Sequence, residues 1–447
     1  MNTSYSIDLI HRFVNKTIET GFDEVAVLLY NNRETMIKIA NSQPSVAQNW
    51  SEISIGIYLV KNKRIFILEL KPVSIDLLLK PVEELVKYAD KVEESMLYAP
   101  LPEPRTVSKL KDLVSNKVLN YIDNPYELVE LSIESAHREK IDYIAGTIDL
   151  WFVNKILVTS KGVELSEDKT GYEIYIRAFK EPDGSGQWCT CGIDIDKKSV
   201  EETSLYASRY AVESINRTSI EPGKYDVILS PLVFGNLLEY VSRMTSALSI
   251  FMGMSMFMNN NPGDKVGSEK LTVHDMPRIN ELPNATSFDD EGIPTFNKPL
   301  IEKGVWKTIL HNTKTAHNFG GETTGNAGWI YPHPWNIVVE PGDYSLDELI
   351  SNVRKGVFIT NNWYTRLQNY VEGLFSTISR DALFLIENGE VKKPVEKIRI
   401  ADKLSNIIKN IDGLTKDTYR IMWWEVRIPS KLPFVLIRDV NITKHML

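Results

Sequence analysis

The segment FGNLLEYVSRMTSALS, residues 234–249, carries the first pair of side chains that could do chemistry. Its apolar residues recur at helical spacing and predict one buried stripe, formed by Leu237, Leu238, Val241, Met244 and Leu248. The stripe leaves Glu239 and Arg243, four residues apart, free to form an ion pair within the helix. A packed helix with a solvated charge pair is the simpler interpretation, because the segment offers neither a nucleophile nor a pair of metal ligands.

Histidines and carboxylates are the next candidates, because they could bind a metal ion. No two histidines are four residues apart, as a helical zinc motif would require. His311 and His317 would lie about 20 Å apart on a strand at roughly 3.3 Å per residue. A loop could still bring them together with the acidic run 289–291, around Asp290, or with His274 and Asp275. Acidic residues beside Gly292 are more commonly a solvated turn, so this site is the minor alternative.

Two sulfur patterns could bind a soft metal. Cys189 and Cys191 would share one face of a strand, although buried, inert thiols are the more common outcome. Met252, Met254, Met256 and Met258 would also face one way if their segment, 252–258, were extended. We favour a soft apolar surface for the methionines over a copper site.

The glycine-rich run GGETTGNAG, residues 320–328, mixes small polar residues without a lysine. Its turn at Thr324, Gly325 and Asn326 could present backbone N–H groups to an anion or a peptide carboxylate. A tight surface turn is the simpler alternative. The sequence shows no G-x-S-x-G nucleophile motif, no P-loop and no dinucleotide fingerprint.

Composition narrows the classes of function. The 447 residues are 43% hydrophobic and 25% charged, which is typical of a folded protein. A formal net charge of −8 disfavours nucleic acid as a partner. The only two cysteines give no disulfide framework and favour a reducing cytoplasm. The longest uncharged apolar run, 244–258, is shorter than the roughly 20 residues of a membrane span, and the N-terminus lacks a secretory signal pattern, so we expect no membrane association.

The elements that must position these residues fall into three regions. Helical periodicity over 7–20, strand-like stretches at 24–30 and 35–40, a hairpin of 53–60 with 65–70, and a helix over 77–88 precede the proline-rich APLPEPR linker. We therefore expect a first α/β domain over 1–103. A middle domain, 104–222, combines helices at 107–121 and 127–139, β-rich sequence over 141–195, and a helix opened by a capping box at Ser199 and Glu202. The third domain covers 223–447 and begins with a strand at 226–229.

Helices and strands mixed in this way predict an α+β protein of several domains, with mixed or antiparallel sheets flanked by helices.

Six segments resemble, by their order and mutual spacing, the family of the paired proteins TldD and TldE, the latter also called PmbA. They are SFDDEGIPT (287–295), LIEKGVW (300–306), TTGNAG (323–328), EPGDYSLDELI (340–350), KGVFIT (355–360) and LIENGEVKKPV (385–395). The resemblance is strong over 224–400, moderate through 159–174, and general in pattern over the first hundred residues. It implies a cytosolic zinc metallopeptidase assembled from two related chains.

In that family the TldD-like chain carries H-E-x-x-x-H on a helix and a cysteine nearer the C-terminus, and these hold zinc and the general base. By the resemblance, the helix matches LLEYVSRMTSALS of this sequence. Glu239 and Met244 then stand at the histidine positions and Tyr240 at the position of the base. The sequence therefore predicts no catalytic residue, no metal ligand and no cofactor in this chain.

These departures resemble the TldE or PmbA type, and the segment 361–384 resembles archaeal members. The resemblance implies a TldD-like partner that carries H-E-x-x-x-H and the zinc, with a homodimer as an option in isolation. We expect small peptides or unfolded segments as substrates. The acidic net charge argues against taking the family's older description as a modulator of DNA gyrase literally.

Six residues are the expected contacts with substrate or partner. Thr324, Gly325 and Asn326 form the turn described above, while Trp363, Tyr364 and Arg366 combine aromatic area with a fixed charge. Two alternatives remain open. One is a stand-alone hydrolase that uses His311, His317 and Asp290, and the other is a peptide-binding module without catalysis.

Overall fold

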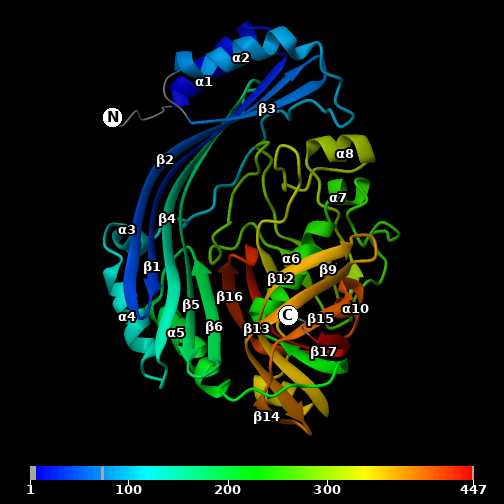
Figure 1. Ribbon diagram of the computed structural model, residues 1–447. Helices are drawn as coiled ribbons and strands as arrows, with labels where there is room; N and C mark the ends of the chain where they lie inside the picture. The colour runs from blue at the N-terminus through cyan, green and yellow to red at the C-terminus, as the bar shows by residue number, and fades with distance from the viewer. Residues whose placement is uncertain (1–6, 72–74, 445–447) are drawn as a thin grey trace.

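The computed structural model describes residues 7–71 and 75–444 and shows an α+β protein built around two sheets (Figure 1). Residues 1–6, 72–74 and 445–447 lie outside this description. Helices flank both sheets, as the sequence predicts. No helix within the described ranges is long and apolar enough to cross a bilayer.

The N-terminal half forms a six-stranded antiparallel sheet in the order β3-β2-β1-β4-β5-β6. Its strands are β1 (Glu24–Ala40), β2 (Gln43–Lys61), β3 (Arg64–Leu70), β4 (Tyr143–Thr159), β5 (Glu164–Lys180) and β6 (Gly184–Gly192). Its helices are α1 (Ile7–Glu19), α2 (Ile75–Ala89), α3 (Asn116–Asp123), α4 (Tyr126–Ala136) and α5 (Lys197–Glu213).

Alternation along the long strands gives this sheet two different faces. In β1, Val25, Val27, Leu29 and Ile37 are buried on one face. Helices α1 and α2 cover that face at one end, and α3, α4 and α5 cover it at the other (Figure 1). The intervening residues, Tyr30 among them, face the C-terminal half of the chain.

The sequence predicted most of these elements. The hairpin, the first helix and the β-rich middle region are confirmed by β2–β3, α1 and β4–β6. The two stretches at 24–30 and 35–40 belong to one strand. The helix expected from 107 begins only at Asn116, where Ser115 accepts a hydrogen bond from Val118 N–H. The capping box predicted at Ser199 was wrong. Helix α5 is capped by Asp196, whose side chain accepts a hydrogen bond from Lys198 N–H.

The expected boundary at residue 103 lies in an extended segment between α2 and α3. The sheet continues across this segment, since β1 pairs with β4 from Ala26–Thr159 to Ile39–Gly146. Strands from the first two expected regions therefore share one sheet.

The C-terminal half holds an eleven-stranded mixed sheet. Its strands are β7 (Gly223–Leu229), β8 (Val273–Asp275), β9 (Lys298–Glu302), β10 (Val305–Trp306), β11 (Ile337–Val339), β12 (Lys355–Asn369), β13 (Leu374–Glu387), β14 (Glu390–Pro394), β15 (Ile398–Lys403), β16 (Ile411–Trp423) and β17 (Val426–Lys444). Strand β7 pairs with both β12 and β17, so β7, β12, β13, β15 and β17 form a closed circuit. The helices are α6 (Pro231–Met244), α7 (Ala247–Phe251), α8 (Thr313–Phe319), α9 (Leu346–Ser351) and α10 (Leu404–Lys409).

A single buried cluster joins the two halves. Trp188 of β6 stacks on Tyr206 of α5 and on Phe434 of β17, with ring centroids 4.8 Å and 5.9 Å apart. Aromatic pairs of this kind bury much area at fixed geometry. Strand β6 is consequently buried along its whole length.

Candidate functional site

Helix α6 positions the side chains that the sequence singled out first. Ser230 caps the helix by accepting a hydrogen bond from Val233 N–H, and Pro231 occupies its first turn. The predicted apolar stripe is confirmed, since its five residues are all buried. The expected continuous helix is interrupted at Thr245 and Ser246, so Leu248 belongs to α7.

Glu239 forms the predicted ion pair with Arg243 and also makes contacts outside its own helix. Its Oε1 accepts a hydrogen bond from Arg243 Nε at 2.9 Å, as the spacing predicted. Its Oε2 accepts two more, from the backbone N–H groups of Arg427 at 2.7 Å and Ile428 at 3.1 Å. The side chain is only 13% exposed. Glu239 therefore anchors the beginning of β17 to α6.

The other two positions of the helix motif also make structural contacts. The hydroxyl of Tyr240 donates a hydrogen bond to the backbone oxygen of Thr365 at 3.3 Å, and burial raises the pKa of this tyrosine. Met244 is 3% exposed and belongs to the core. Neither side chain points to metal chemistry.

Trp363, Tyr364 and Arg366 lie together at a bulge in β12, where the pairing with β13 shifts register. Tyr364 has a positive φ of 57°, and its N–H donates to Glu425 Oε1 at 3.1 Å. The Arg366 guanidinium lies 4.3 Å from the centre of the Tyr364 ring. Trp363 and Tyr364 are 37% and 50% exposed. The structure thus brings these three predicted residues to one surface.

Two residues extend this surface, which we call the aromatic bulge. The Arg380 guanidinium lies 5.4 Å from the Trp363 ring centre and 5.5 Å from that of Trp424, which is 39% exposed. We define the aromatic bulge as Trp363, Tyr364, Arg366, Arg380 and Trp424. Exposed aromatic rings beside guanidinium groups are the composition of binding hot spots.

A buried amide network holds the bulge against α6. Asn362 Nδ2 donates to Asn236 Oδ1 of α6 at 2.9 Å and to Thr377 Oγ1 of β13 at 2.9 Å. Thr365 Oγ1 donates to the same Asn236 oxygen at 2.5 Å. Sequence reasoning missed this network, because Asn236 is more than a hundred residues from Asn362 and Thr365 and none of the members forms a motif. The network fixes the aromatic bulge to the helix that carries Glu239 and Tyr240.

Thr324, Gly325 and Asn326 lie in a different place, and their polar groups are largely occupied. Asn326 is fully buried, with Nδ2 donating to Asp275 Oδ2 at 2.6 Å and Oδ1 accepting from Lys298 Nζ at 3.0 Å. Thr324 exchanges hydrogen bonds with the backbone of His311. Gly325 has a φ of 67°, and its oxygen accepts from Trp335 Nε1 at 2.9 Å. Within the described residues, no hydrogen bond, ion pair or ring contact joins this turn to the aromatic bulge.

Asp289 and Glu291 of the acidic run 289–291 are buried and Asp290 is only partly exposed, so the solvated turn expected there was wrong. Asp289 accepts hydrogen bonds from the N–H groups of Glu291, Ile293 and Ala327. Burial and the neighbouring Glu291 charge raise the pKa of Asp289 to about 7.

Two lysines neutralise the rest of the run. Asp290 pairs with Lys155 of β4 at 2.9 Å, and Glu291 pairs with Lys314 of α8 at 2.9 Å. Together with the Lys298–Asp275 pair at 3.1 Å, they form a buried charge network that packs the C-terminal half onto the first sheet. We call Lys155, Asp275, Asp289, Asp290, Glu291, Lys298, Lys314 and Asn326 the buried clamp.

The structure does not bring His311, His317 and Asp290 into one hydrogen-bonded set. His311 Nδ1 is bonded to Thr315 Oγ1 at 3.1 Å, and burial lowers the pKa of its ring. His317 is exposed on α8, whereas Asp290 is held by Lys155. Across the described part of the chain, no three His, Cys, Asp or Glu side chains converge as a metal site would require.

The sulfur patterns take structural positions. Cys189 and Cys191 are buried on β6, and burial raises the pKa of both thiols. The methionine segment 252–258 runs through turns after α7, so the extended arrangement considered for it was wrong. Met252, Met254 and Met258 are nevertheless 58%, 37% and 42% exposed and form apolar surface.

Comparison with known families gives two matches. The PmbA/TldA metallopeptidase C-terminal domain matches residues 222–444, and domain 1 of the same metallopeptidases matches residues 25–95.

Proteins that are similar in sequence to this chain include metalloproteases of archaea and bacteria. A metalloprotease of Methanocaldococcus jannaschii is 27% identical over 66% of this chain and 67% of its own length. A metalloprotease of Methanothermobacter thermautotrophicus is also 27% identical, over 64% of this chain and 66% of its own length. A PmbA homologue of Buchnera aphidicola is 30% identical over 48% of this chain and 47% of its own length.

Solved structures share the fold. TldE from Thermococcus kodakarensis aligns with a TM-score of 0.83 at 19% identity, covering 97% of this chain and 100% of that one. A protein of Thermotoga maritima described as a modulator of a DNA gyrase aligns with a TM-score of 0.84 at 22% identity, covering 98% and 99%.

Proposed function

Because this chain belongs to the PmbA/TldD metallopeptidase family, we propose that it is the TldE-like, non-metal subunit of a two-chain zinc metallopeptidase. A TldD-like partner with H-E-x-x-x-H holds the zinc and the catalytic base. The complex works in the cytoplasm on small peptides or unfolded segments, and this chain shapes the chamber around the partner's active site.

The contacts of α6 carry this proposal. At the positions that the resemblance aligns with H-E-x-x-x-H, the chain has Glu239, Tyr240 and Met244. The Glu239 carboxylate is occupied by Arg243 and two backbone N–H groups. Burial raises the pKa of the Tyr240 phenol, and Met244 is packed in the core. These residues do not fit a zinc ion, which needs several unprotonated nitrogen, sulfur or oxygen ligands facing one point.

We assign the contact with partner or substrate to the aromatic bulge. Its rings are partly exposed, and the amide network ties Asn362 and Thr365, which flank Trp363 and Tyr364, to α6. Rigid aromatic and arginine side chains lose little conformational entropy on binding. Contact through Thr324, Gly325 and Asn326 stays a prediction, and their occupied hydrogen-bonding groups make it the weaker assignment.

Zinc analysis and a peptidase assay test the proposal. The purified chain should contain no stoichiometric zinc and cleave no peptide, and mixing with a TldD-like partner should raise cleavage of an unfolded peptide above that of the partner alone. Zinc-dependent cleavage by this chain alone would identify a stand-alone hydrolase. Peptide binding without any gain on mixing would identify a binding module.

A further inference from the structure

The two edges of the first sheet differ. At one edge, β6 is buried along its whole length under α5 and the C-terminal half. At the other edge, every residue of β3 is partly or fully exposed, and β2 is its pairing partner on one side only. An edge strand of this kind presents unpaired backbone N–H and C=O groups to another extended chain.

The turn that leads into β3 shows which backbone groups face outward. Asn62 and Lys63 have φ values of 46° and 62°, as in a two-residue type I′ hairpin. Such a turn makes Lys61 and Arg64 a hydrogen-bonded pair, and pairs then alternate along the ladder. Ile65 and Ile67 fall on the non-bonded positions, so their N–H and C=O groups point away from β2.

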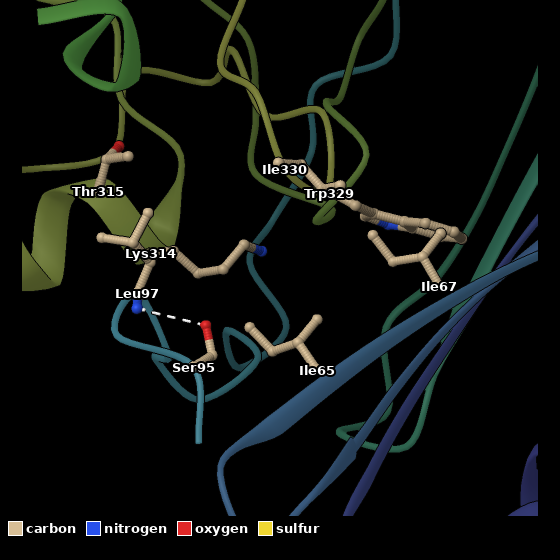
Figure 2. A pocket seen from close by; sticks show the side chains of 8 residues that line it. All are labelled: Ile65, Ile67, Ser95, Leu97, Lys314, Thr315, Trp329 and Ile330. Carbon is tan, nitrogen blue, oxygen red and sulfur yellow. Dashed lines mark hydrogen bonds between the residues drawn. The ribbon is translucent and has the colours of Figure 1, made fainter. Parts of the chain in front are cut away.

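A pocket lies beside the same two residues (Figure 2). Its volume is about 300 Å³, and its walls are mostly apolar. It is lined by Ile65, Ile67, Ser95, Leu97, Lys314, Thr315, Trp329 and Ile330. The space is at the lower end of the range for ligand sites and can take one large apolar side chain.

Lys314 supplies the only charged group of this lining. Its side chain is 7% exposed, with Nζ 2.9 Å from Glu291 Oε1 and 4.6 Å from the centre of the Tyr58 ring. Figure 2 shows the ammonium end directed toward the open space between Ile65 and Trp329. An ammonium has three N–H donors, so Lys314 can also bond an oxygen in the pocket. Because Glu291 already neutralises it, a neutral carbonyl suits the pocket better than a carboxylate.

We propose that the β3 edge binds an extended, neutral peptide segment as an added strand. The peptide backbone pairs with Ile65 and Ile67, one apolar side chain enters the pocket, and a peptide carbonyl accepts a hydrogen bond from Lys314. The inference rests on the proposed function only for the peptide nature of the ligand. Its test uses this chain alone, so its failure is distinct from a failure of the mixing experiment.

A second copy of the chain fits the edge less well. In an antiparallel pair of β3 strands centred on Ile67, the turn residue Lys63 of one copy would come near Lys71, which follows β3, of the other. Like charges close to each other at the ends of a strand pair destabilise it. A peptide without lysines avoids this repulsion.

Fluorescence anisotropy with a defined probe measures the binding. The probe is a heptapeptide of alternating leucine and threonine, with fluorescein on its N-terminal amine and an amidated C-terminus. We expect saturable binding, at least tenfold weaker binding when proline replaces the residues that pair with β3, and no gain from a free carboxylate end. Absence of binding, or equal binding of the proline peptide, would overturn the proposal.

Two matched variants locate the site. Ile330→Asp places a charge at the mouth of the pocket on a residue that is 61% exposed, and should weaken binding about tenfold. Val391→Asp makes a comparable change on a 44% exposed residue of β14, at the opposite end of the molecule from β3 (Figure 1), and should leave binding unchanged. Circular dichroism and thermal melting check that both variants fold. Equal effects of the two variants would contradict the site, as would a dimer in sedimentation that Ile330→Asp dissociates.

Discussion

The buried clamp and the aromatic bulge are both built from residues that stand out in the sequence, yet their surroundings are opposite. In the clamp, Asp275, Glu291 and Lys298 are at most 4% exposed, and their charges are paired. In the bulge, Trp363 and Tyr364 keep a third to a half of their surface exposed. The clamp contains residues of the segments SFDDEGIPT and TTGNAG, on which the family resemblance rests, but its carboxylates are paired or hydrogen-bonded within the protein. Motif strength and availability for binding are therefore separate properties.

Breaking the clamp should give the largest effect on stability. Lys298→Met leaves the Asp275 carboxylate buried without its cation, and loss of one partner of a buried pair costs about 3–5 kcal/mol. Urea unfolding should show a loss of that size in the free energy of unfolding. Lys392→Ala, which removes an exposed pair with Glu390, is the control and should leave the free energy of unfolding nearly unchanged. Similar losses for both variants would contradict the distinction.

Substitutions at two glycines, one at the end of α8 and one in the loop after it, should have smaller effects on stability than Lys298→Met. Gly325 and Gly320 have similar φ values of 67° and 73°, but a Cβ at Gly325 would lie 2.7 Å from Pro294 O, whereas none of the described atoms lies within 4 Å at Gly320. Both alanine variants incur backbone strain of about 1–3 kcal/mol, and Gly325→Ala adds a steric clash. Thermal melting should show the larger loss for Gly325→Ala. Equal losses would mean that the clamp loop adapts to the added methyl group.

The clamp should also make stability depend on pH. Asp289 has a folded pKa of about 7 against an ordinary value of 3.8, so the folded state binds the proton more tightly than the unfolded state. Stability should therefore fall as the pH rises from about 4 to about 7, by at most about 1.4 kcal/mol per pH unit from this group. Asp289→Asn should flatten the dependence in urea titrations at several pH values. If the free energy of unfolding of Asp289→Asn depends on pH as steeply as that of the unsubstituted protein, the dependence arises from other groups.

A substitution in the aromatic bulge should have a small effect on stability and a large effect on binding. Trp363→Ala removes a partly exposed ring, so the free energy of unfolding should fall by about 1 kcal/mol or less. The affinity for the TldD-like partner, measured by titration calorimetry, should fall about tenfold or more, as for a binding hot spot. Val371→Ala, a change at another exposed residue, is the control. Unchanged affinity in Trp363→Ala would remove the bulge from the interface.

Local patterns predicted the elements well. The apolar stripe of α6 and the Glu239–Arg243 pair depend on spacing within one helix, and both are present. The second role of Glu239 could not be predicted, because the N–H group that it binds belongs to Arg427, 188 residues later. The same holds for Asp290, whose carboxylate is paired with Lys155 of a distant strand.

For the site residues too, local patterns were predictable and long-range contacts were not. Their types at 363–366 predicted an aromatic surface, because large rings and arginine suit binding wherever they are exposed. Nothing in the local sequence shows that Asn236 and Asn362 meet beneath it. Asn326 appeared available in a glycine-rich turn, but long-range contacts with Asp275 and Lys298 bury it.

Native mass spectrometry of the mixed chains shows which chain holds the zinc. We expect a complex of this chain, one TldD-like partner and one zinc ion, with the zinc retained by the partner when the complex is dissociated. Zinc that stays on this chain after dissociation, or a partner that never binds this chain, would rule out its role as the non-metal subunit.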